Sequence, residues 1–156
     1  MDVKRRFVLR GAGAAGAMVA AAAAGLVKPS AALAAPFNKA AHEAKNTADA
    51  MKALGITSPA ESKDIVIKAP DIAENGAVVP IEIESKIPNT ESIAVFIDKN
   101  PFPFVGSFDV SKSGVPFVAI RVKVGESSPV RVVAMAGGKA YTTAKEVKVT
   151  IGGCGG

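Results

Sequence analysis

Short runs that are apolar, or that alternate between apolar and polar residues, dominate the chain after residue 64. These runs lie at residues 65–67, 78–87, 93–97, 105–110, 117–124, 130–135 and 146–151. In the run 117–124, valine and isoleucine occupy one face, and Arg121 and Lys123 occupy the other. Alternation with a period of two is typical of strands that bury one face. The pattern therefore predicts seven β-strands.

Two of these runs have features that set them apart. Residues 93–97 are apolar on both faces, so we expect a central strand that is buried on both sides. The run 78–87 contains Pro80, which cannot donate a hydrogen bond to a neighbouring strand, and we expect an edge position or a bulge there. A Gly137-Gly138 turn and Tyr141 separate the last two runs.

One helix is expected, over residues 37–54. Its apolar positions recur at steps of three and four residues and form one stripe: Phe37, Ala40, Ala41, Ala44, Ala48, Met51 and Leu54. The stripe is rich in alanine, so we expect the helix to lie shallowly on the domain or on a partner. His42 lies on this helix without other ligand residues at metal-binding spacing, so we expect it to be a surface residue rather than a metal ligand.

The order of these elements favours an all-β fold, an immunoglobulin-like antiparallel β-sandwich with a short N-terminal helix and a flexible C-terminal arm. The chain has no Trp and a single cysteine, so Val, Ile and Phe must form the core without an internal disulfide. The predicted segments are a signal peptide at 1–34, the helix and a linker at 35–61, the sandwich at 62–151 and the arm at 152–156.

The first 34 residues have the pattern of an export signal. A basic block that contains Arg5-Arg6 precedes an uncharged run rich in Ala and Gly at 11–27, and Ala32-Leu33-Ala34 is a small-residue cleavage site. The paired arginines favour the twin-arginine route and therefore a periplasmic location. The alternative is an uncleaved membrane anchor, for which the run is short and weakly apolar.

Removal of this segment changes the charge of the chain. Of the net charge of +5, five basic residues and one acidic residue in 1–34 account for +4, which leaves +1 on 122 residues. The remaining chain gives no argument for nucleic acid or for an anionic membrane as a partner. With one histidine, no CxxC and no phosphate-binding loop, it also lacks the residues of an independent enzyme, a metal site or a cofactor site.

The chemistry of the chain concentrates in its last five residues, in which Gly152, Gly153, Gly155 and Gly156 flank Cys154. Glycine leaves the backbone free and the thiol without neighbours, so we interpret the segment as an arm that brings Cys154 to a partner. The arm has no base or cation that would activate the thiol, which favours a passive attachment point for sulfur over a nucleophilic catalyst. The alternatives are an incidental cysteine in a glycine tail and a permanent disulfide to a partner.

Phe102 and Phe104 lie in an irregular, proline-containing connection between two strands. Together with the shallow helix stripe, they suggest more apolar surface than a monomer would expose, so part of this surface is expected to face a partner. The alternative is that the two phenylalanines close one end of the sandwich.

Three stretches together resemble the SoxY family: the leader, the run 69–80 with its sequence IAENGAVVP, and residues 148–156, which end in GGCGG. SoxY proteins are sulfur-carrier subunits of the bacterial thiosulfate-oxidising (Sox) system. The resemblance covers essentially the whole chain after the leader. It implies that Cys154 is the carrier cysteine, to which a pair of c-type cytochromes joins thiosulfate oxidatively.

The resemblance also implies partners and the absence of a catalytic role for the chain itself. The carrier pairs with SoxZ, a small β subunit without its own leader, which the twin-arginine route could export together with this chain. A sulfate-releasing hydrolase and, in some organisms, a sulfane dehydrogenase act on the bound sulfur. No cofactor other than the sulfur intermediates on Cys154 is implied.

Overall fold

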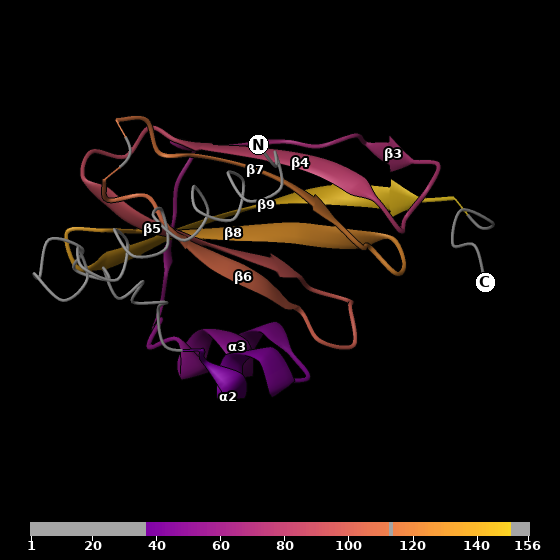
Figure 1. Cartoon of the computed structure of the whole chain (residues 1–156), viewed down its shortest axis with the longest axis horizontal. Helices are drawn as coiled ribbons and strands as arrows, with labels where there is room; N and C mark the ends of the chain where they lie inside the picture. Colours follow the sequence, from indigo (N-terminus) through magenta and orange to yellow (C-terminus); the bar gives the residue numbers. More distant parts are fainter. Residues whose placement is uncertain (1–36, 113, 151–156) are drawn as a thin grey trace, which may run out of the picture. The chain divides into compact units, whose positions relative to one another are not determined.

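Two β-sheets and a pair of short helices make up residues 37–112 and 114–150, the part of the chain that the computed structural model describes (Figure 1). The large sheet has the order β1-β9-β8-β5-β6, and β3 pairs with β9 outside this path. Its strands are β1 (Ala60–Glu61), β3 (Ile72–Ala73), β5 (Thr90–Ile97), β6 (Phe104–Asp109), β8 (Ser128–Ala136) and β9 (Lys139–Val149). The small sheet has the order β2-β4-β7, with β2 (Ile65–Lys68), β4 (Val79–Ser85) and β7 (Phe117–Val122).

The two sheets pack face to face over a core of aliphatic side chains. Successive strands cross from one sheet to the other between β4 and β5, β6 and β7, and β7 and β8, which is the connectivity of an immunoglobulin-like sandwich. The fully buried members of this core are Val79, Ile83, Ile93, Val95, Ile97, Val124, Val130, Val132, Ala134 and Val147. The predicted all-β sandwich is therefore confirmed, and its core is built without a disulfide or tryptophan among the described residues.

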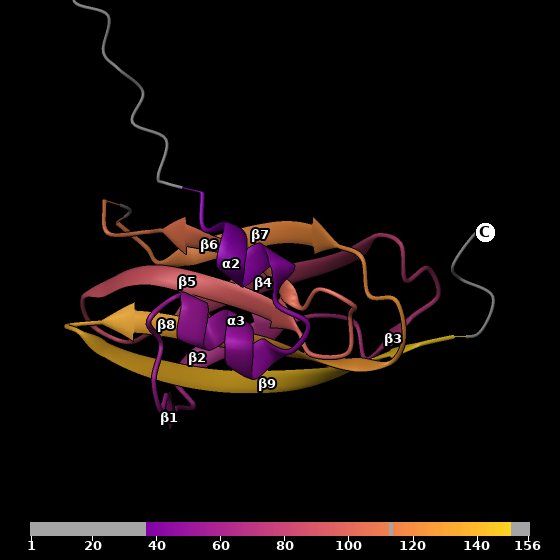
Figure 2. The same ribbon diagram turned by 90° about the horizontal axis from the view of Figure 1, so that it is seen from below.

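β5 is buried on both faces, as its sequence predicts, because each face of the large sheet has a covering layer. Val95 points into the sandwich core, whereas Phe96 belongs to a second cluster that includes Ala41 and Ala50 of the helices. Figure 2 shows the helix pair over β5 and β8, on the side of the large sheet away from the small sheet. Ala41 and Ala50 are fully buried there, and their small side chains let the helices approach the sheet closely. Phe37, Ala40 and Ala48 of the predicted stripe are exposed, so the stripe does not mark the buried face of the helix pair.

The prediction of one helix over residues 37–54 is wrong. Two helices are present, α2 (Lys39–Glu43) and α3 (Thr47–Ala53), and Ala44 between them is extended, with φ −60° and ψ 136°. The cause is Asn46, whose side chain accepts a hydrogen bond from the amide of Asp49 at 2.8 Å. Asparagine caps a helix N-terminus better than it continues a helix, so a new helix starts there.

Three expectations about the strands also need correction. The last strand starts at Lys139 rather than at residue 146, because Gly137 and Gly138, at φ 55° and 73°, make a two-residue hairpin with β8. Pro80 is not on an edge strand: β4 is central in the small sheet, and β2 pairs with it only from Glu82 onward. The sandwich is not wholly antiparallel, since β1 and β3 pair with β9 in parallel.

The two phenylalanines near the connection between β5 and β6 differ in burial: Phe104 is buried and Phe102 is exposed. Phe104 is buried beneath the helices, where its ring lies 5.4 Å from that of Phe96 and 4.6 Å from that of His42. Phe102 is 49% exposed, and Lys45 Nζ lies 3.6 Å from its ring centroid. The prediction that both phenylalanines offer apolar surface to a partner is therefore wrong for Phe104.

A polar network attaches the helix pair to the sandwich. Asp98, directly after β5, accepts hydrogen bonds from Arg131 Nη2 of β8 at 2.8 Å and from the Thr47 hydroxyl of α3 at 2.9 Å. The carboxylate thereby joins three elements that are far apart in the sequence.

Candidate functional site: the base of the C-terminal arm

The residues predicted to carry the chemistry, Cys154 and its flanking glycines Gly152, Gly153, Gly155 and Gly156, lie outside the described residues. The structure describes the chain up to Thr150, four residues before Cys154. The site is therefore approached from its base, which we define as Lys148–Thr150 and the groups that bind them.

The base extends beyond the hairpin that forms most of β9. The pairing of β9 with β8 ends at Val147, which lies opposite Ser128. Beyond this point the amides of Lys148 and Thr150 donate to the carbonyl oxygens of Asp71 and Ala73, at 3.0 and 3.3 Å. Each of these two amides is thus held by the backbone of β3 and the residue before it.

The remaining amide of the base points the other way. The amide of Val149 donates to Ser127 Oγ at 2.9 Å, just before the start of β8. Successive amides of an extended chain point to opposite sides. The amides of Lys148 and Thr150 therefore donate toward β3, and the amide of Val149 donates to a side chain on the side where β8 no longer pairs. Lys148–Thr150 consequently keep a strand's hydrogen bonds past the end of the hairpin.

β3 is itself anchored to the domain. Ala73 is buried in the sandwich core, whereas Ile72 is 59% exposed. Lys145 Nζ of β9 donates to the carbonyl oxygen of Ala69 at 2.7 Å and lies 3.0 Å from Asp71 Oδ1, so the segment entering β3 is tied to β9 by a charged group. After β3, the Asn75 side chain accepts a hydrogen bond from the amide of Ala77 at 2.9 Å, which turns the chain back toward β4.

Two stretches on which the resemblance rests, 69–80 and 148–156, therefore meet in space at β3 and the end of β9. Beyond the resemblance, sequence analysis assigned no functional role to residues 69–80. A two-residue strand is too short for alternation to reveal, and neither Ser127 nor Lys145 belongs to a recognisable motif. The contribution of β3, Ser127 and Lys145 to this site emerges only from the fold.

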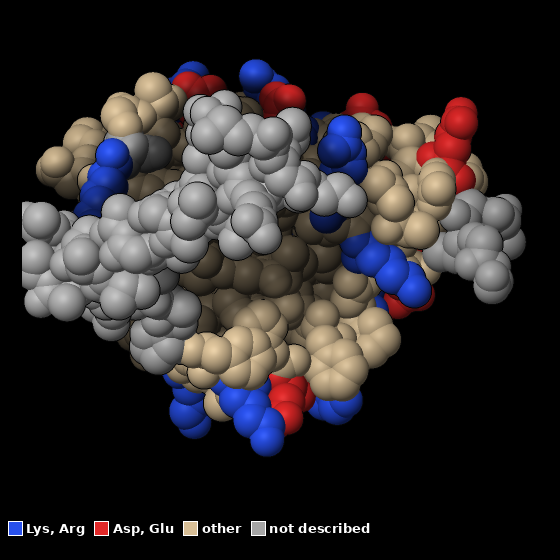
Figure 3. Space-filling model, viewed as in Figure 1, with Lys and Arg blue, Asp and Glu red and all other residues tan. Residues whose placement is uncertain are grey.

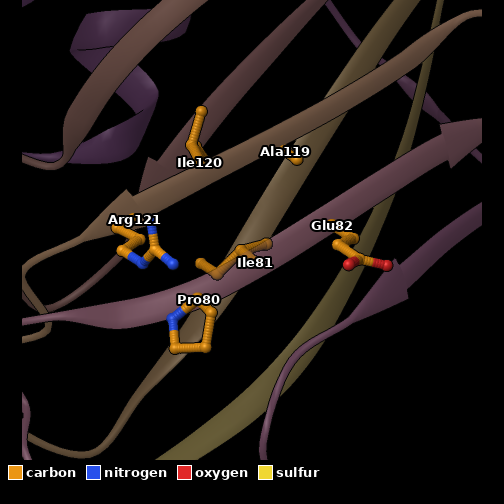
Figure 4. A pocket seen from close by; sticks show the side chains of 6 residues that line it. All are labelled: Pro80, Ile81, Glu82, Ala119, Ile120 and Arg121. Carbon is orange, nitrogen blue, oxygen red and sulfur yellow. The ribbon is translucent and has the colours of Figure 1, made fainter.

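Other parts of the described structure offer less chemistry. A pocket of about 260 Å³ between β4 and β7 is lined by Pro80, Ile81, Glu82, Ala119, Ile120 and Arg121. Figure 4 shows Arg121 and Glu82 at opposite sides of this pocket, and the six lining residues include no Ser, Thr, Cys, His or Lys. Within residues 37–112 and 114–150, no group of three or more His, Cys, Asp or Glu residues could hold a metal ion.

The charges on the face shown in Figure 3 do not gather by sign. In Figure 3, basic and acidic side chains alternate along the visible rim of the face that is not covered by grey atoms.

Ser111 donates from its hydroxyl and its amide to Asp109, at 2.5 and 2.9 Å, and these bonds lower the pKa of that exposed carboxyl below its usual value. They close a turn after β6. Neither described helix has the length and hydropathy needed to cross a membrane.

The chain is similar to one family and to one solved structure in particular. The profile of the family "Sulfur oxidation protein SoxY" matches residues 50–154. The sulfur carrier protein SoxY from Chlorobium limicola f thiosulfatophilum is 42% identical, with a TM-score of 0.59 over 67% of this chain and 96% of that chain.

Other comparisons add little. An engineered protein matches at 12% identity and a TM-score of 0.39, over 56% of this chain and 20% of that chain, which is too low to support an argument. No curated protein matches the chain. The family match covers every described strand, the base of the arm and position 154. The chain therefore belongs to the SoxY family of sulfur oxidation proteins.

Proposed function

We propose that the chain is a periplasmic sulfur carrier that holds thiosulfate-derived sulfur covalently on Cys154 and presents it to the enzymes of thiosulfate oxidation. The observation that carries this proposal is the family match, which runs through residue 154, the only cysteine in the chain. The solved structure that is 42% identical is also described as a sulfur carrier protein. The described chain leads to this cysteine along a strand that is hydrogen-bonded as far as Thr150.

The carrier step is an oxidation in which the protein supplies only the thiol. The Cys154 thiol and thiosulfate form a new S–S bond, giving a cysteine S-thiosulfonate, and they release one proton and two electrons. The resemblance implies that a pair of c-type cytochromes accepts the electrons. Hydrolysis of the bound group by one water then releases sulfate and one proton and leaves a persulfide, S–SH, on Cys154, which exchange chemistry can pass on.

In this proposal the chain is a substrate carrier and not an enzyme. We propose that the twin-arginine leader exports it, that a SoxZ-like small β subunit forms a heterodimer with it, and that the pathway enzymes bind transiently. It needs no cofactor, and it binds neither nucleic acid nor, after the leader is removed, a membrane.

The test is the Cys154→Ser variant in the reconstituted thiosulfate-oxidising system. We expect unchanged urea unfolding and complete loss of thiosulfate-dependent turnover, because the thiol is the only attachment point. A matched control restores one thiol elsewhere by adding Ser107→Cys, at an exposed position of β6. This control should be as inactive as Cys154→Ser. Normal turnover by the folded serine variant would contradict the carrier role.

A further inference from the structure

β3 contributes one buried residue, Ala73, to the sandwich core, and it pairs with β9 where the pairing of β9 with β8 ends. The β8–β9 hairpin ends at the pair Ser128 and Val147, and β3 pairs with Lys148 and Val149 directly beyond it. Without β3 and Ser127, the chain would have no hydrogen-bonded partner for Lys148–Thr150 among the described residues. Three more residues would then be added to the segment that leads to Cys154.

We propose that β3, Ser127 and Lys145 form a clamp that fixes the point at which the carrier arm leaves the domain and thereby sets the reach of Cys154. This proposal rests on the proposed carrier function, since reach matters only if the arm delivers sulfur. Ser127 and Lys145 act as positioning residues, through the backbone at 148–150 and the segment that enters β3.

Lys145 is suited to this role because it joins β9 to the segment that precedes β3. It lies on β9, and its ammonium binds both the Ala69 carbonyl oxygen and the Asp71 carboxylate, just before β3. The side chain of Lys145 is 33% exposed and that of Asp71 87% exposed, so most of the effect is expected from the hydrogen bond to Ala69 rather than from the screened ion pair. Ser127 holds the intervening amide from the opposite side at 2.9 Å.

The consequence for reach follows from chain length. Cys154 is four residues beyond Thr150 but seven residues beyond Val147. At about 3.3 Å per extended residue, the segment that is free to reorient lengthens from about 13 Å, measured from Thr150, to about 23 Å, measured from Val147, when the clamp opens. The root-mean-square length of a glycine-rich chain grows as the square root of residue number, so the spread of thiol positions grows about 1.3-fold. The clamp therefore narrows the volume in which the thiol can lie.

The first measurement is amide hydrogen exchange on the Cys154→Ser chain, in which no disulfide can form. Ser127→Ala, Lys145→Met and the double variant should exchange the amides of 148–150 roughly threefold to tenfold faster, with larger changes in the double variant. Lys145→Arg keeps the charge and the donors and should restore slow exchange. Lys139→Met and Ser107→Ala are matched controls at exposed positions on β9 and β6.

The second measurement reports reach itself. Spin labels on Cys154 and on an added Ser107→Cys give a distance distribution, which should widen by up to about 1.3-fold in the double variant. The distribution should return to its original width with Lys145→Arg in place of Lys145→Met. Unchanged exchange at 148–150 in the double variant, or an unchanged distribution, would overturn the clamp. Neither measurement requires sulfur transfer, so a negative result would overturn the clamp without contradicting the carrier proposal. The carrier proposal is tested separately, by the turnover of the Cys154→Ser variant.

Discussion

The layer beneath the helices should make a large contribution to stability, and Phe96→Ala tests it. Phe96 is 0% exposed on the outer face of β5, where it packs against α2, α3 and the Phe104 ring at 5.4 Å. A buried phenylalanine removes about 200 Å² from water, worth about 5 kcal/mol as an upper bound, and measured Phe→Ala losses are about 3–5 kcal/mol. We expect a loss of about 4 kcal/mol in the free energy of unfolding.

This loss is a large fraction of the total, because a domain of this kind has a stability of about 5–15 kcal/mol. Urea unfolding of the Cys154→Ser chain is the assay. With a slope of about 2 kcal/mol per molar urea, the midpoint should fall by about 2 M. Phe117→Ala is the matched control, because Phe117 also lies on a strand but is 45% exposed, and its loss should stay below about 1 kcal/mol.

Similar losses for the two variants would refute the reasoning, since they would mean that the helix pair does not bury the outer face of β5. A Phe96→Ala loss of less than about 1 kcal/mol would refute it as well.

Two further predictions concern the polar network and the arm. Asp98→Asn should lower the free energy of unfolding by about 1–2 kcal/mol, because it removes the charged acceptor of Arg131 and Thr47, whereas Lys99→Gln on the exposed neighbour should change the urea midpoint little. Gly153→Val should leave unfolding unchanged but slow the loading of thiosulfate, because a β-branched side chain restricts the backbone and widens the segment beside the thiol. Equal loading rates for the valine and native chains would mean that this glycine is incidental.

The sandwich could be predicted because its information is local. Alternation marks strands wherever one face is buried and the other is in water, as in β7, and the doubly apolar run 93–97 marks the central strand β5. The first half of β9 lacks this signal. Thr142 occupies one of its buried positions, where its hydroxyl donates to the carbonyl oxygen of Val132 at 3.0 Å, so the sequence there does not look apolar.

What could not be predicted depends on contacts between distant residues. The bond between Asp98 and Arg131 joins positions 33 residues apart, and that between Lys145 and Ala69 joins positions 76 apart. The break between α2 and α3 could have been predicted, because Asn46 followed by Thr47 and Asp49 is a capping pattern. The alanine stripe, which continues through these residues, favoured one continuous helix instead. The chemical site itself could be inferred only from its cysteine, its glycines and the family resemblance.

The central claim is that Cys154 carries sulfur from thiosulfate. Trypsin cleaves after Lys148 and releases residues 149–156 as one peptide that contains the only cysteine of the chain. Mass spectrometry of this peptide, from protein isolated from thiosulfate-fed cells, should show sulfur adducts on Cys154 that dithiothreitol removes and that are missing without thiosulfate. A protein–protein disulfide at Cys154 under all growth conditions, or an unmodified thiol in thiosulfate-fed cells, would contradict the claim.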